Sequence, residues 1–161
     1  HAGVDVNPDA ARAAAERYGY DTFTGTVDAA LAAGAVLRGA FDLVLYQFVL
    51  EHLADPVASL TTAAAALQAG GALAVLVPSM EAVELDVFGG AYRSLRRDHL
   101  HLFTRRSLAR CLVRAGLRPV AFETHCALHL LRGFLSEESL AALYAAGRGP
   151  DLLGVAVRDG P

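Results

Sequence analysis

Residues 41–56 read "FDLVLYQFVLEHLADP" and join a strand pattern directly to the start of a helix. The continuous apolar run that opens this stretch is typical of a strand covered on both faces, as in a parallel sheet. Asp55 and Pro56 are the residue types that begin helices, at the N-cap and the first helical position. Glu51 and His52 stand between the two patterns. The stretch therefore places two ionisable side chains just beyond the end of a core strand.

The segment that follows completes a strand–helix–strand unit. Apolar positions at helical spacing run from Val57 to Leu67, and Gly70 with Gly71 is predicted to end this helix. "ALAVLVPS" (72–79) is a second buried strand. Such a crossover is nearly always right-handed and makes the two strands parallel neighbours.

Further strands and helices alternate on both sides of this unit. Helices are predicted to begin at caps and strands to lie between them: caps Asn7, Thr104 and Ser136; strands around 3–4, 22–24, 117–125 and 151–159. This alternation predicts an α/β fold, a doubly wound and mostly parallel sheet with helices on both faces. Residues 80–103 have mixed periodicity, so we expect a long lid or acceptor loop over the sheet. Ligands of such sheets bind outside the carboxyl ends of the strands.

The composition fits one domain, residues 1–161. The chain has 54% hydrophobic residues and a formal net charge of -3. Its basic residues form no long cluster, so neither nucleic acid nor a membrane surface is an expected partner. Its apolar runs are too short to span a bilayer, and we expect a cytoplasmic protein. Cys111 and Cys126 have neither disulfide-framework nor metal-type spacing, and both are expected to be free.

Asp5 follows the first strand and allows two interpretations. Its carboxylate is placed to accept hydrogen bonds from the hydroxyls of a ribose. It can equally complement the dipole of the helix that begins at Pro8.

Four segments, in this order, carry a resemblance to a known family: "GVDVNPDAARAA", "FDLVLYQFVLEHLADP", "LQAGGALAVLVPS" and "DHLHLFTRRSLARCLVRAGL". They resemble the class I S-adenosylmethionine-dependent methyltransferases, which have a Rossmann-like fold, and among them the small-molecule branch with an "EH..DP" segment after the fourth strand. The resemblance implies S-adenosylmethionine as cofactor and a small molecule as methyl acceptor. Acceptor choice would fall to residues 80–103 and 127–135.

The resemblance also implies cofactor-binding positions. Asp5 matches the acid that binds the ribose. Thr26 and Val27, after Gly25, fall where the adenine-contacting turn lies. Three further residues match the turn beside the methionine part of the cofactor: Tyr46, Gln47 and Phe48.

One departure from the family is plain in the sequence. The glycine-rich "GxGxG" loop and its strand, which precede the acid strand in the family, have no counterpart here. We therefore expect an incomplete methyltransferase domain, a fragment with weak cofactor binding and weak or no activity. The sheet should have a gap or a new pairing between Gly3–Val4 and Phe41–Leu45. An exposed sheet edge there would favour a homo-oligomer.

The candidate catalytic residues are His52, Glu51 and His99. Methyl transfer needs donor and acceptor held close and, for many acceptors, a proton removed. A histidine suits that removal, and Glu51 is placed to orient it or to bind the acceptor. The alternative is structural: Glu51 and His52 begin a helical turn, and His99 is a loop histidine.

We expect no metal site. Some quinone-biosynthesis O-methyltransferases that resemble this segment hold a divalent metal through its acids and histidine, but Phe48 stands where they have a further acid. The His99-x-His101 pair offers only two ligands, and a site needs three or four.

Two other functions remain open at this point. A non-catalytic methyltransferase-like binding or scaffold module would also lack the glycine loop. One half of a nicotinamide-dependent oxidoreductase would account for Asp5, but it leaves "LEHLADP" without an explanation.

Overall fold

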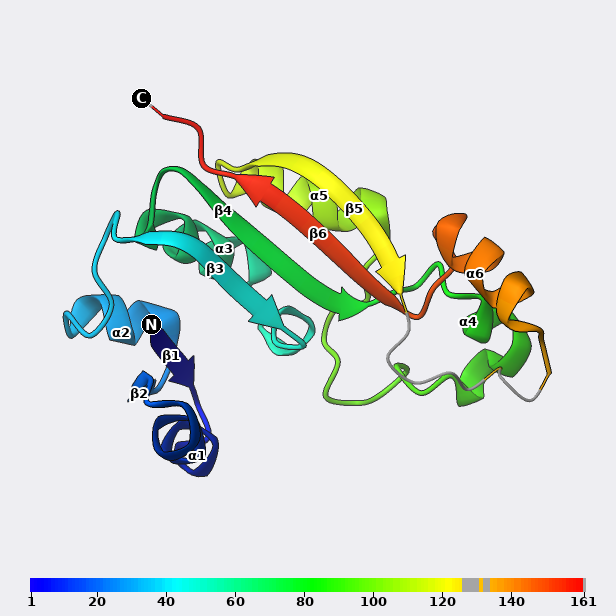
Figure 1. Ribbon diagram of the computed structural model, residues 1–161, viewed down its shortest axis with the longest axis horizontal. Coiled ribbons are helices and arrows are strands. Elements are labelled where there is room, and N and C mark those ends of the chain that lie inside the picture. The colour runs from blue at the N-terminus through cyan, green and yellow to red at the C-terminus, as the bar shows by residue number, and fades with distance from the viewer. Residues whose placement is uncertain (126–130, 132–133, 161) are drawn as a thin grey trace.

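The computed structural model describes residues 1–125, 131 and 134–160. Strands and helices alternate along these residues, as Figure 1 shows. The strands are β1 (Ala2–Asp5), β2 (Asp21–Thr24), β3 (Phe41–Gln47), β4 (Leu67–Pro78), β5 (Arg118–His125) and β6 (Asp151–Val157). The α-helices are α1 (Pro8–Tyr18), α2 (Val27–Ala32), α3 (Pro56–Ala66), α4 (Val83–Phe88), α5 (Arg105–Arg114) and α6 (Glu137–Ala145), with short 3₁₀ helices η1 (Leu50–His52) and η2 (Gly89–Ala91).

The larger sheet has four strands in the order β3-β4-β6-β5. β3 and β4 are parallel, with Tyr46 opposite Val75, as the crossover through α3 predicts. β6 is antiparallel to both of its neighbours. The α/β class is confirmed, and the sheet is mixed because β6 enters it from the opposite end.

Side-chain caps set the helix starts where the sequence predicts them. Asn7, Asp55 and Ser136 each accept a backbone N–H from the first turn of their helix. Thr104 forms a reciprocal capping box with Ser107. The end of α3 differs from the expectation, because Leu67 is already extended (φ -71°, ψ 144°) and pairs with Phe41. The pairing with β3 thus ends the helix before the two glycines are reached.

Residues 80–103 contain more structure than the expected loop. α4 and η2 lie within them, beyond the carboxyl end of β4 (Figure 1). The buried Tyr92 hydroxyl donates toward the carbonyl oxygens of Ser79 and Pro150, at 3.0 and 3.2 Å. Ser79 also forms a bridge with Phe103. These contacts tie the middle and the C-terminal end of the segment to the end of β4 and the start of β6.

The main core lies between the larger sheet and two helices, α3 and α5. Leu60 on α3 and Leu108 and Leu112 on α5 are fully buried in it. The opposite face differs from the expected second helix layer: among the described residues it leaves Leu43 and Leu45 each 58% exposed. None of the described helices is long and apolar enough to cross a membrane.

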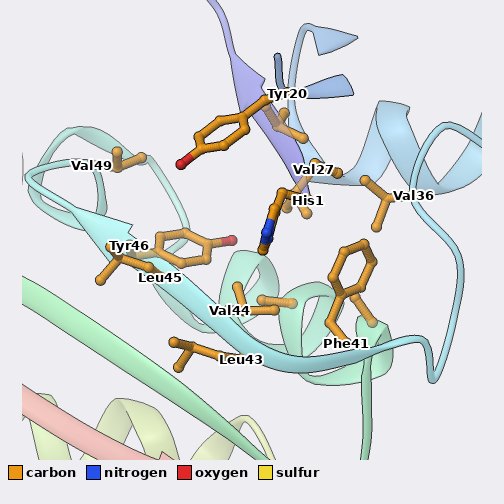
Figure 2. A pocket seen from close by; sticks show the side chains of 14 residues that line it. His1, Tyr20, Val27, Val36, Phe41, Leu43, Val44, Leu45, Tyr46 and Val49 are labelled. Carbon is orange, nitrogen blue, oxygen red and sulfur yellow. The ribbon is translucent and has the colours of Figure 1, made fainter. Parts of the chain in front are cut away.

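β1 and β2 form a separate parallel sheet. Among the described residues no strand joins β1 or β2 to β3. The sheet therefore has the gap that was expected between β1 and β3. A cavity of about 490 Å³ lies between β1 and β3, lined mainly by apolar side chains. Figure 2 shows His1 pointing into it, toward Val44 and Tyr46 on β3.

Candidate functional site

The candidate site lies where β3 ends and η1 begins. Phe48, directly after β3, is the non-glycine residue that the structure describes with a positive φ, 52°. Its backbone N–H donates to the carbonyl of Leu76 on β4 at 2.9 Å, which holds this unfavourable conformation in place. The tight turn directs the chain out of the sheet and into η1, which carries Glu51 and His52.

Three predicted residues come together there. Glu51 is 1% exposed, and its Oε1 lies 4.0 Å from Nε2 of His52. The rings of His52 and His99 meet edge to face, with centroids 4.8 Å apart. The backbone N–H of His101 donates to the carbonyl of Glu51 at 3.1 Å and so fastens the segment that carries His99 beside η1. The sequence predicted Glu51 and His52 as a pair and His99 separately, and the fold makes the three residues one cluster.

Backbone carbonyls orient both imidazoles. Nδ1 of His52 lies 2.7 Å from the carbonyl oxygen of Asp98, and Nδ1 of His99 lies 2.9 Å from that of Ser94. A carbonyl oxygen only accepts, so each Nδ1 carries the proton and donates. In the neutral rings, Nε2 is therefore the basic nitrogen of both histidines.

Burial shifts the acid–base behaviour of this cluster. Desolvation raises the pKa of Glu51, the nearby charge of Asp151 raises it further, and its own backbone N–H and His52 oppose the rise. Desolvation lowers the pKa of His99, with the charge of His52 acting in the same direction. His99 thus favours the neutral form, which has a free lone pair.

A second polar group at the end of β4 and the start of β6 was not predicted from the sequence. Arg93 pairs with the buried Asp151 at 2.9 Å. Glu84 on α4 is fully buried, and desolvation raises its pKa, while its own backbone N–H and then the charge of Arg93 oppose the rise. No local sequence pattern predicts this group, because its members lie up to 67 residues apart in the sequence (84 to 151).

The predicted ribose and adenine residues lie at the ends of β1 and β2. Asp5 is exposed, and one of its oxygens accepts the N–H of Asn7 at 2.7 Å. Its carbonyl accepts the N–H of Gly25 at 2.9 Å, which brings the two turns together. Thr26 caps α2 by accepting from Ala29, and Val27 lines the cavity beside β3. Asp5 and Thr26 therefore have local structural roles as well as the positions that the resemblance implies.

The residues predicted beside the methionine part of the cofactor differ in burial. Tyr46 is buried, and its hydroxyl lies 2.9 Å from the hydroxyl of Ser59 on α3, so this side chain belongs to the core. Gln47 and Phe48 are exposed.

The remaining candidates are separate from the cluster or lie outside the described residues. Nε2 of His101 lies 3.4 Å from the carbonyl oxygen of Ala54. Cys111 is free, as predicted, whereas Cys126 lies outside the described residues. Of the proposed acceptor segment 127–135, the structure describes only Leu131, Phe134 and Leu135.

S-adenosylmethionine-dependent methyltransferases from several organisms are among the solved structures with this fold. One is an enzyme from Archaeoglobus fulgidus, with 17% identity and a TM-score of 0.68 over 97% of this chain and 75% of that one. Another, from Thermotoga maritima, is described as a possible histamine N-methyltransferase, with 19% identity and a TM-score of 0.73 over 98% of this chain and 72% of that one.

A third similar structure is the complex of the Haloferax volcanii Trm112 methyltransferase activator with a putative methyltransferase. The identity is 16% and the TM-score 0.62, over 99% of this chain and 83% of that one. At such identities these likenesses establish the fold alone. No curated protein matches the chain in sequence.

Sequence similarity to a family is stronger evidence than fold. The family model described as a methyltransferase domain matches residues 2–121, which is most of the chain and includes β1, the Glu51–His52 pair and His99. The chain therefore belongs to the family of methyltransferase domains.

Proposed function

We propose that this domain transfers a methyl group from S-adenosylmethionine to a small-molecule acceptor at the carboxyl end of β3, beside η1. The observation that carries the proposal is the cluster of Glu51, His52 and His99, with the basic Nε2 of each imidazole free of the backbone. It lies at the carboxyl end of β3, the edge at which such sheets bind ligands.

The residues at the ends of β1 and β2 fit the nucleoside part of the cofactor. Asp5 and the turn at Gly25 are held together by a backbone hydrogen bond, so a ribose acceptor and an adenine-contacting turn are adjacent. The glycine-rich loop that approaches the amino acid part in the family has no counterpart among these 161 residues. Cofactor affinity of this chain is accordingly expected to be weak.

His52 is the proposed general base. S-adenosylmethionine would supply an electrophilic methyl carbon on a sulfonium. The acceptor must therefore offer a nucleophilic lone pair to this carbon. Nε2 of His52 would take the proton of an acceptor hydroxyl or amine as the acceptor's lone pair bonds to that carbon. The carbon–sulfur bond would break, and its electron pair would leave on sulfur as S-adenosylhomocysteine. Glu51 stabilises the imidazolium from 4.0 Å, and His99 limits the position of the ring. His52 then returns the proton to solvent, to which its side chain is 38% exposed.

The test is isothermal titration of S-adenosylhomocysteine into this chain and into a longer form from its native reading frame. Binding by the longer form, with little or none by the chain alone, is the expected result. Asp5→Asn in the longer form should weaken binding, because the amide has one acceptor oxygen instead of two.

The same longer form tests the base. His52→Ala should leave the affinity for S-adenosylhomocysteine unchanged. It should lower the rate of methyl transfer from labelled S-adenosylmethionine by about 10²–10⁴-fold. Turnover unchanged in this variant would remove His52 from the mechanism. No binding by either form would instead favour the scaffold function, in which Asp5 is an ordinary acid at a helix start.

A further inference from the structure

Glu51, His52 and His99 have the composition and spacing of a metal-binding site. Each offers one ligand atom, and these atoms all lie within 4.8 Å of one another. Glu51 is buried, His99 is half-buried, and the side chain of His52 is 38% exposed. The cluster is thus closed on one side and has an approach from solvent on the other.

A second observation at the same place points to a cation. Oε2 of Glu51 has no hydrogen-bond partner among the described residues, although the side chain is 1% exposed. A buried carboxylate oxygen without a partner is costly, and a bound cation is one way to satisfy it. The charge of Asp151 also acts on Glu51, so the surroundings on that side are acidic.

Both histidines are already oriented as metal ligands usually are. A ligating imidazole generally donates its second N–H to a carbonyl or carboxylate, which fixes the tautomer and the ring position. His52 and His99 do this through Nδ1 to the carbonyls of Asp98 and Ser94. The nitrogen left on each ring is the unprotonated Nε2, the form that binds a metal.

We propose that Glu51, His52 and His99 bind one divalent first-row transition-metal ion. Two imidazole nitrogens and one carboxylate oxygen suit zinc, cobalt or iron, whereas magnesium and calcium prefer oxygen ligands. Ligand atoms around tetrahedral zinc are about 3.3 Å apart, from bonds of about 2.0–2.1 Å. Binding therefore draws the ligand atoms together by at most about 1.5 Å, and Oε1 of Glu51 and Nε2 of His52 by about 0.7 Å. The remaining positions of the ion stay open toward solvent, on the side of the partly exposed His52.

The third ligand, His99, is brought to the other two by the fold and could not be placed there from the sequence. The sequence argument against a metal rested on Phe48, which replaces an acid close to Glu51. His99 lies 47 residues beyond His52 in the sequence and is brought to it by the bonded ends of residues 80–103. The site shares its residues with the proposed function but does not depend on methyl transfer. An ion on Nε2 of His52 would occupy the lone pair that the proposed base uses, so His52 acts as a base only in the metal-free chain.

The experiment is titration of the untagged, chelator-treated chain with zinc by calorimetry, and with cobalt by visible absorption. One ion per chain, with the intense absorption of four- or five-coordinate cobalt, is expected. His99→Ala and Glu51→Gln should each weaken binding at least about tenfold. His101→Ala is the matched control on the same segment, and its affinity should equal that of the parent chain.

A measurement on the unaltered chain covers the case in which a variant fails to fold. Nitrogen-15 spectra of the imidazoles should show Nε2 of His52 and His99 shifting on addition of zinc, while both Nδ1 remain protonated. Unchanged Nε2 signals, binding retained in His99→Ala, or no binding at all would overturn the site. No S-adenosylhomocysteine binding by the longer form, with zinc binding by the chain intact, would count against the proposed function alone.

Discussion

Glu84 is a fully buried glutamate whose two carboxylate oxygens have no hydrogen-bond partner among the described residues. Burial raises its pKa above the ordinary 4.5, its own backbone N–H and the charge of Arg93 oppose this rise, and the charge of Asp151 adds to it. Tyr92 is a titratable neighbour of Glu84. Burial raises the pKa of the Tyr92 hydroxyl, and the charge of Glu84 adds to this rise. The folded state therefore favours the protonated carboxyl.

This raised pKa predicts how Glu84→Gln changes stability with pH. Below the unfolded pKa the carboxyl is neutral in both states, so parent and variant should be equally stable. As the pH rises, the unfolded chain releases the proton first, and the parent loses stability until the folded pKa is passed. A glutamine side chain has no proton to release, so the variant should be more stable by about 1–3 kcal/mol at neutral pH.

Urea unfolding of both proteins from about pH 4 to about pH 7 measures this difference. Glu16→Gln, at an exposed position of α1, is the control and should follow the parent. A stability difference that is constant with pH, or that favours the parent at neutral pH, would contradict the assignment of Glu84 as a buried acid.

Among the strands and helices, β6 is the strand on which the larger sheet depends, because it pairs with both β4 and β5. Gly154 lies in its middle, opposite Phe122 on β5 and beneath α5. A Cβ there would lie 2.9 Å from Cδ2 of Leu108 and 3.0 Å from Cε1 of Phe122. A side chain at this position would have to displace Leu108 and Phe122, and glycine lets α5 pack close to the sheet without that displacement.

Gly154→Ala is accordingly predicted to destabilise the domain by about 1–3 kcal/mol through overpacking. Gly90→Ala is the matched control, since a Cβ at Gly90 meets no heavy atom within 4 Å. Thermal or urea unfolding of the two variants measures the difference. Equal stabilities would mean that Leu108 moves aside at no cost.

Across the molecule as a whole, the two separate sheets leave strand edges and apolar side chains exposed. β3 pairs only with β4 among the described residues, and Leu43 and Leu45 on it are more than half exposed. Unpaired edges of this kind associate with other chains. We predict that this chain self-associates with rising concentration, in line with the homo-oligomer expected from the sequence.

Sedimentation velocity at several concentrations tests this prediction. The double variant Leu43→Lys, Leu45→Lys should shift the population toward monomer, because the charges repel a second edge. Val113→Lys, at an equally exposed apolar position on α5, should leave association unchanged. A monomeric parent at all concentrations would show that the edge is protected in solution.

Local sequence predicted most of the helices and strands, but not which face of the larger sheet the helices cover. Asn7, Asp55, Thr104 and Ser136 cap the helices as expected, because a cap depends on residues only three positions away. The end of α3 was misplaced, since strand pairing at Leu67 outweighed the helical spacing. The single helix-covered face of the larger sheet was likewise not predictable, because it depends on which elements meet in space.

Short-range patterns of apolar residues, caps and glycines account for two features of this chain, the α/β class and the turn that delivers Glu51 and His52 beyond β3. The missing pairing between β1 and β3 was expected from the resemblance to a family whose central strand has no counterpart here. Packing in three dimensions was needed to bring His99 to His52, to bury Glu51, and to assemble the second polar group around Arg93 and Asp151. Such contacts join residues far apart in the chain, and their energies depend on desolvation, which exists only once the elements have packed.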